Sequence, residues 1–154
     1  MHADFLRYAI DLARQNVSDG GGPFGAIIVK DRRIIASSGN RVTPNLDPTA
    51  HAEVMAIRAA CQALGDFQLT DCTLYTSCEP CPMCLGAVYW ARLKEVYFAC
   101  NRFAAAAAGF DDSFIYEEIP KRPAQRSIAM HYLEISEADS PFLAWNRLEN
   151  KTPY

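Results

Sequence analysis

Two short motifs constrain this 154-residue chain more than any other feature: HAE at residues 51–53 and PCPMC at residues 80–84. Each stands at the start of a predicted helix, the first over 50–64 and ending at Gly65, the second over 81–92. A helix N-terminus favours negative charge and lowers the pKa of a nearby thiol. The sequence therefore places an imidazole, a carboxylate and thiolates at two helix starts.

Three cysteines of the second motif region are evenly spaced, but they are not equivalent. Residues three apart on a helix share a face, so the sulfur atoms of Cys81 and Cys84 can point at one spot. Glu79 precedes Pro80 and is pushed away from helical geometry. Cys78 is therefore expected outside the helix, at the end of a strand, as a neighbour of the pair and not as a ligand.

The donor set of these motifs suits zinc. One imidazole, His51, and two thiolates, Cys81 and Cys84, are nitrogen and sulfur ligands of the kind that zinc prefers. Three protein ligands leave a fourth position for a water or hydroxide, which is typical of a catalytic site. Glu53, two residues after the imidazole, can take a proton from that water and deliver it to a substrate. We expect one Zn²⁺ per subunit.

Other interpretations of the same residues stay open at this point. A lone C-x-x-C can be a redox pair, and Cys78 is the best candidate for the fourth ligand of a structural zinc site. A non-catalytic, zinc-stabilised binding module is the alternative from a different class. The open ligand position and Glu53 speak against it.

The amino-acid composition further narrows the class of protein to which the chain can belong. The chain is 50% hydrophobic and 21% charged, which is ordinary for one globular domain. Its net charge of −3 disfavours a large nucleic-acid partner. No apolar run approaches the roughly 20 residues of a membrane span, and the first residues do not resemble a signal peptide. We expect a cytoplasmic protein with reduced cysteines.

The order of predicted elements indicates a three-layer α/β/α domain with a mixed sheet of about five strands. Predicted strands cover 24–30, 34–38, 72–76, 95–99 and 128–135; predicted helices cover 4–15, 50–64, 81–92 and a last segment that opens with Ser140 as N-cap and Pro141 at its first position. The segment 40–48 is expected to be a polar loop.

H-x-E followed by P-C-x-x-C is the signature of zinc-dependent base deaminases. The longer strings at 21–29, 47–58 and 73–99 resemble bacterial guanine deaminases and tRNA adenosine deaminases. The resemblance implies the cytidine-deaminase-like fold. It also implies that Asn40 hydrogen-bonds a purine ring and that the backbone N–H of Ala52 helps to bind the attacked centre.

The second half of the chain resembles the guanine deaminases specifically. AGFDDSFIYEEI at 108–119 and SPFLAWNRLENKTPY at 140–154 are similar to that family, whereas the alanine-rich stretch 100–108 departs from it. The resemblance implies a homodimer that exchanges the C-terminal helix and tail, about 140–154, within a single domain of residues 1–154. It implies that Tyr154 closes the partner's pocket and that Asp112 joins the chemistry.

Without the resemblance, the residue types in the second half of the chain indicate less about function. Asp112 sits in a sequence typical of a turn or helix cap, and Tyr154 in a segment typical of a frayed end. A purine pocket needs aromatic walls, for which Phe24 and Phe114 are preferred.

The predicted reaction is hydrolytic deamination of guanine to xanthine and ammonia. The alternatives are a tRNA adenosine deaminase, which would need a basic track for RNA, and a deaminase of another amino-purine, a nucleoside or a triazine.

Overall fold

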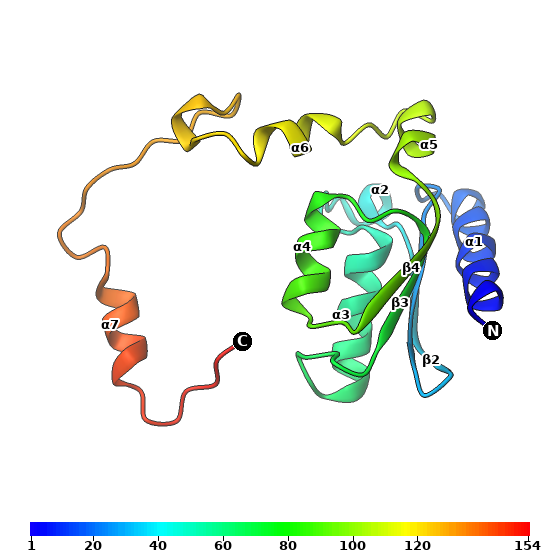
Figure 1. The fold of residues 1–154 in the computed structure, drawn as a ribbon, viewed down its shortest axis with the longest axis horizontal. Helices are drawn as coiled ribbons and strands as arrows, with labels where there is room; N and C mark the ends of the chain where they lie inside the picture. Colours follow the sequence, from blue (N-terminus) through cyan, green and yellow to red (C-terminus); the bar gives the residue numbers. More distant parts are fainter. The chain divides into compact units, whose positions relative to one another are not determined.

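The computed structural model describes all residues from 1 to 154 and divides into two compact units, Met1–Asp112 and Ser113–Tyr154. Figure 1 shows the helices and strands of both units in sequence colours, from blue at the N-terminus to red at the C-terminus. Each unit is described separately.

The first unit is built on a four-stranded mixed sheet in the order β2-β1-β3-β4. Its strands are β1 (Gly25–Lys30), β2 (Arg33–Gly39), β3 (Thr73–Cys78) and β4 (Glu95–Cys100). β1 pairs antiparallel with β2 and β3, and β3 pairs parallel with β4. The β1–β2 turn has positive φ at Asp31 (50°) and Arg32 (62°), which matches the right-handed twist of a hairpin.

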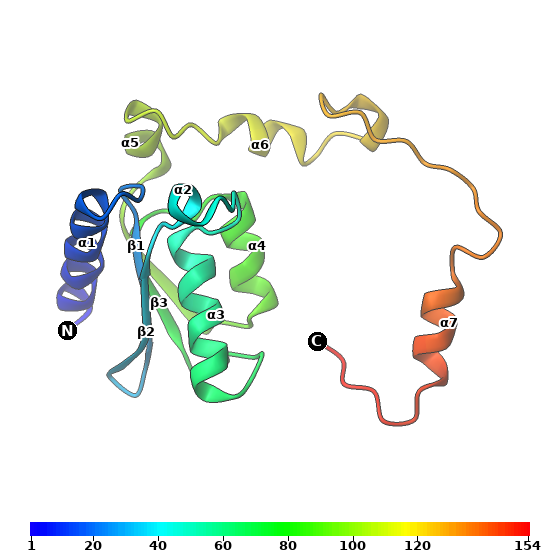
Figure 2. The same cartoon turned by 180° about the vertical axis from the view of Figure 1, so that it is seen from behind.

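Helices cover both faces of this sheet, as Figures 1 and 2 show from opposite sides. α1 (His2–Ser18) lies on one face, where Ile27, Val29 and Tyr75 pack against its apolar side chains. α3 (Ala52–Leu64) and α4 (Pro82–Trp90) lie on the other face. The predicted three-layer α/β/α architecture is confirmed.

The two central strands are buried on both faces, and small residues make this possible. Ala52, Ala56 and Ala60 are fully buried and recur every fourth residue along α3, so the helix presents one smooth stripe to Ala26 and Ile28 of β1. The close approach of α3 to the sheet places its N-terminus at the carboxyl end of β3.

The remaining helices are short. The first unit also holds α2 (Val42–Asn45), a single turn within the predicted polar loop, and α5 (Arg102–Ala107). The second unit holds α6 (Ser113–Glu118), the 3₁₀ turn η1 (Pro123–Gln125) and α7 (Ser140–Arg147). None of its residues is buried.

Two predictions need correction. Residues 128–135 form no strand, so the sheet has four strands and not about five. A strand needs a neighbour for its backbone hydrogen bonds, and the second unit contains none. The last helix starts at Ser140 itself, with Asp139 as its N-cap, one residue earlier than predicted.

No helix of this chain is both long enough and apolar enough to span a membrane.

Candidate metal centre and substrate site

The metal-ligand atoms of His51, Cys81 and Cys84 all lie within 4.8 Å of one another. His51 is the N-cap of α3 and Cys81 is the N-cap of α4, so the two helix starts face each other. The His51 Nδ1 atom lies 3.5 Å from the Sγ atoms of both cysteines. Residues some thirty positions apart in sequence thus converge on one point.

The spacing of these donor atoms fits a tetrahedral zinc ion. Zinc binds sulfur at about 2.3 Å and nitrogen at about 2.0 Å, so tetrahedral ligands of these two kinds stand roughly 3.5 Å apart. The two distances from His51 Nδ1 to the cysteine sulfurs, both 3.5 Å, have this length. The donor set and its geometry therefore fit zinc without rearrangement.

The backbone around the cysteines differs in one respect from the sequence-based interpretation. Cys81 precedes Pro82 and has extended geometry (φ −65°, ψ 169°), so it caps α4 and does not lie within it. From this N-cap position its sulfur still lies within 4.8 Å of the Cys84 sulfur. Cys78 ends β3, as predicted, and is not part of the three-residue cluster.

Glu53 lies beside this cluster in a buried position. Its side chain is only 6% exposed, the Thr76 hydroxyl lies 3.4 Å from its Oε1, and the Cys84 sulfur lies 3.5 Å from its Oε2. Burial raises the pKa of Glu53. Sequence reasoning missed Thr76, although a hydroxyl in a fully buried strand signals a polar partner nearby.

The cysteines have contrasting acidities when only protein groups act on them. The pKa of Cys81 is lowered to about 4, first because the Cys84 thiol donates a hydrogen bond to it and also because His51 does. The pKa of Cys84 is raised because it keeps the shared proton and is buried. Burial raises the pKa of Cys78 to about 11. The hydrogen bond with Cys81 raises the pKa of His51.

Asn40 and Phe24 are held together next to the helix starts. The backbone N–H of Asn40 donates to the Phe24 carbonyl at 3.0 Å. The Asn40 side-chain Oδ1 accepts the Val42 N–H at 3.1 Å. The Phe24 ring contacts the Phe110 ring edge-on, with centroids 5.0 Å apart and planes at 87°. Phe110 is thus an aromatic neighbour that the sequence-based choice of Phe24 and Phe114 left out.

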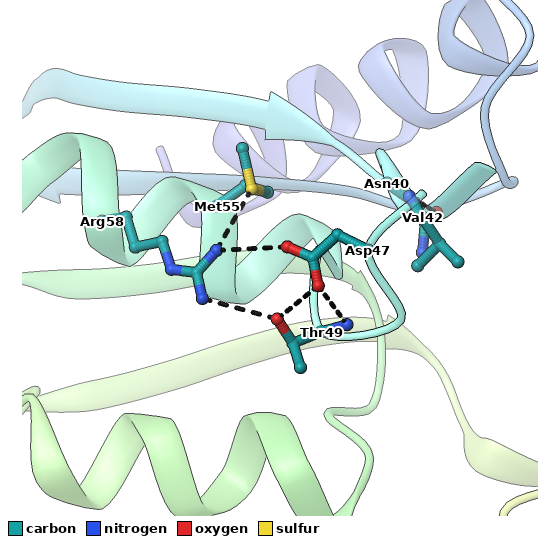
Figure 3. Close-up of polar contacts among 6 residues, drawn as sticks. All are labelled: Asn40, Val42, Asp47, Thr49, Met55 and Arg58. Atoms are coloured by element: carbon teal, nitrogen blue, oxygen red, sulfur yellow. Dashed lines mark hydrogen bonds and ion pairs between the residues drawn. The ribbon is translucent and has the colours of Figure 1, made fainter. Parts of the chain in front are cut away.

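The loop that leads into His51 is closed by a polar cluster, drawn in Figure 3. Asp47 Oδ1 accepts the Thr49 N–H at 2.8 Å and the Thr49 hydroxyl at 2.7 Å. The guanidinium of Arg58, on α3, lies 3.7 Å from Asp47 Oδ2 and 3.4 Å from the Thr49 hydroxyl. The hydrogen bonds from Thr49 lower the pKa of Asp47.

The other predicted site residues fall into two groups. Ala52 is the first residue of α3, where backbone N–H groups have no intrahelical acceptor. Asp112 ends the first unit, and burial raises its pKa; its part in the chemistry stays a prediction. Phe114 and Tyr154 belong to the second unit, and their roles stay predictions.

A zinc-sized donor cluster beside a buried carboxylate, at two helix starts of a three-layer fold, defines a zinc-dependent hydrolytic deaminase site. Residues 1–100 match the family described as the cytidine and deoxycytidylate deaminase zinc-binding region, and the chain belongs to this family.

Individual members of the family differ in how similar they are to this chain and in how much of it they match. The chain is 58% identical to guanine deaminase of Bacillus subtilis over 154 residues, which is 99% of both chains. The X-ray structure of that enzyme superposes with a TM-score of 0.99 and covers 100% of this chain and 99% of that one. A tRNA-specific adenosine deaminase of Agrobacterium fabrum is 44% identical over 97 residues, 63% of this chain and 64% of that protein.

Proposed function

We propose that this protein deaminates guanine hydrolytically, giving xanthine and ammonia. The observation that carries this function is that similarity to a guanine deaminase extends over the whole chain, including residues 113–154. The similarity to a tRNA-specific adenosine deaminase covers 63% of the chain. The substrate is accordingly a small purine base.

The catalytic metal is one zinc ion per subunit, with His51, Cys81 and Cys84 as its ligands. Their donor atoms lie within 4.8 Å of one another, and the sulfur–nitrogen distances match a tetrahedral site. Zinc bound by these residues would supply a water whose pKa is lowered toward roughly 7.

Glu53 moves the protons of the reaction. Its carboxylate takes the proton of the attacking water and passes it to a ring nitrogen of guanine, which makes the amine-bearing carbon more electrophilic. Addition of the oxygen gives a tetrahedral carbon. Glu53 then takes the remaining proton of the added oxygen and delivers it to the amine, so that the carbon–nitrogen bond breaks, ammonia leaves and the carbonyl of xanthine forms. Burial raises the pKa of this carboxyl group above its ordinary value, which makes it a better proton acceptor.

The remaining residues hold the base and exclude water. Asn40 binds the edge of the purine, the Ala52 N–H binds the attacked centre, and Asp112 assists the departure of the amine. Phe24 forms one aromatic wall of the pocket. Phe114 forms the other aromatic wall, and Tyr154 of the exchanged segment closes the partner's pocket.

The assembly is a homodimer in which the C-terminal segment, about 140–154, is exchanged between subunits. Two observations support it. The segment 113–154 has no buried residue and exposes large apolar side chains, among them Tyr132, Leu133 and Phe142. In the first unit, α4 exposes Tyr89 at 71%, and β4 is an edge strand. An exposed edge and apolar patch of this kind is typical of an interface.

The test of the function is ammonia release from guanine, adenine, cytosine, guanosine and an adenosine-containing tRNA hairpin, with and without a zinc chelator. We expect release from guanine that the chelator abolishes and zinc restores. Release from the hairpin alone would replace this proposal with tRNA deamination. A zinc-loaded protein that releases ammonia from none of them would be a binding module. The cytoplasmic location stays a prediction.

A further inference from the structure

Asn16 is a buried polar side chain that the proposed reaction does not use. It lies in the last turn of α1 and is 5% exposed. Its Nδ2 donates to the Gly22 carbonyl and to the Asn40 carbonyl, both at 2.8 Å. Its Oδ1 accepts from Arg41 Nη1 at 3.3 Å. One amide therefore joins the end of α1 to two separate segments near the candidate site.

The surrounding backbone leaves room for this amide only because two residues lack a side chain. A Cβ on Gly39 would lie 2.2 Å from Asn16 Cγ, and a Cβ on Gly21 would lie 2.3 Å from Asn16 Nδ2. Either contact is shorter than real Cβ atoms allow, so a side chain at 21 or 39 would displace the amide. The two glycines and Asn16 form one close-packed joint.

The joint bears directly on Asn40, the expected purine-binding residue. The Asn40 carbonyl is held by Asn16, its N–H by the Phe24 carbonyl, and its Oδ1 by the Val42 N–H. Oδ1 already accepts this hydrogen bond, which orients the amide so that its Nδ2 donor is available to a ligand. Guanine has hydrogen-bond acceptor atoms on its ring and at O6. A donor fixed at this position therefore donates a hydrogen bond to one of these acceptors.

We propose that Asn16 is a positioning residue for purine binding. It fixes the backbone of Asn40 so that the Asn40 amide stands ready to donate to an acceptor atom of the purine. The role rests on the proposed function, because the ligand that Asn40 meets is the purine substrate. A joint that positions a binding group controls substrate affinity more than the rate of the chemical step.

The decisive variant is Asn16→Asp, which keeps the shape of the side chain but turns its donor into an oxygen that faces two carbonyl oxygens. We expect KM for guanine to rise about five- to tenfold, since hydrogen bonds that orient the binding group are lost. The kcat should stay close to that of the parent, and the zinc content should not change. Arg41→Met removes one contact of the joint, so it should also raise KM, but by a smaller factor than Asn16→Asp does.

The control variant is Leu69→Ala, which loses a fully buried core side chain away from the joint. It should lower Tm and leave KM unchanged. A zinc-loaded, folded Asn16→Asp protein with parental KM would overturn the proposal, as would a variant that changes Tm alone. If Asn16→Asp fails to fold, the KM of Arg41→Met decides in the same way.

A substrate-independent measurement separates this proposal from the function on which it rests. In the zinc-loaded parent, the side-chain amide protons of Asn40 should give one narrow pair of NMR signals. In Arg41→Met and Asn16→Asp the pair should shift and broaden, whatever the substrate. If the parent released no ammonia from guanine, the proposed function would fail, and unchanged Asn40 signals would separately refute the positioning role.

Discussion

The cysteines of residues 78–84 show how three identical side chains acquire different properties from their surroundings. Cys78 closes a buried strand, and burial raises the pKa of its thiol to about 11. Cys81 caps a helix, and its pKa is lowered to about 4, first by the hydrogen bond from Cys84 and also by that from His51. Helix position and hydrogen bonding, not spacing in sequence, decide which sulfur is a thiolate.

Removal of zinc should therefore expose one reactive thiolate in this region. In chelator-treated protein at pH 6, Cys81 should react with iodoacetamide, because pH 6 lies above its pKa of about 4 and the thiolate is the nucleophile. Cys78 should become reactive only as the pH approaches its pKa of about 11. Mass spectrometry of the labelled peptide locates the label. Labelling of Cys81 at the same rate in zinc-loaded protein would contradict its role as a ligand.

Glu53→Gln tests the proton-transfer role directly. The amide keeps the size of the side chain but cannot accept the proton of water, so kcat for guanine should fall roughly a thousandfold. Zinc content should be parental, and Tm should not fall, because a buried ionisable group is replaced by a neutral one. Metal analysis and steady-state kinetics check both expectations. Near-parental turnover would remove Glu53 from the mechanism.

At the scale of elements, the loop before α3 determines where the imidazole stands. Asp47 turns the chain by accepting the N–H and hydroxyl of Thr49, and Arg58 ties this turn to the helix two turns further on (Figure 3). The Arg41 N–H closes the base of the loop by donating to the Ala50 carbonyl at 2.8 Å. His51 follows this closed loop directly, so its position depends on the turn.

Asp47→Ala should loosen this loop and weaken metal retention. We expect zinc to pass to a chelator several-fold faster than from the parent, because His51 is no longer held in place. Asp66→Ala is the matched control, since Asp66 Oδ1 accepts the Gln68 N–H at 2.9 Å in a similar turn beyond the other end of α3. Equal rates of zinc loss from the two variants would show that the Asp47 turn does not support the metal site.

At the scale of the whole molecule, the two units differ in their capacity to stand alone. The first unit has two core clusters, one on each face of its sheet. The second has no buried residue, so its apolar side chains bury too little surface to stabilise it in isolation. In the proposed homodimer, a second copy of the chain would cover these side chains, and the two-fold symmetry would make the contact reciprocal.

Mixed dimers can test whether the tail works in the partner's site. Glu53→Gln and a variant that lacks residues 150–154 should each be nearly inactive as homodimers. When they are co-expressed, about a quarter of the sites should combine an intact Glu53 with a tail from the other chain in a two-fold dimer. Guanine deamination by the purified mixture measures this recovery. Activity no greater than the sum of the homodimers would show that the tail serves its own chain.

Local signals in the sequence were sufficient for the elements of the first unit. Helices were predicted where α1, α3 and α4 are found, and strands were predicted where β1 and β2 are found. These features depend on interactions between residues that are close together in the sequence, so a short stretch of sequence is enough to predict them. The donor set for zinc was recognisable for the same reason, because its spacing follows from two helix starts.

Tertiary structure alone decided what depends on distant partners. The carboxylate of Glu53 lies beside Thr76 of a strand, and Asn16 of the first helix holds the backbone of Asn40. No local pattern encodes such pairs, because hydrogen bonds of buried groups are chosen by packing. Residues 128–135 have the composition of a strand but no pairing partner within their unit, and a β-ladder exists only between two strands.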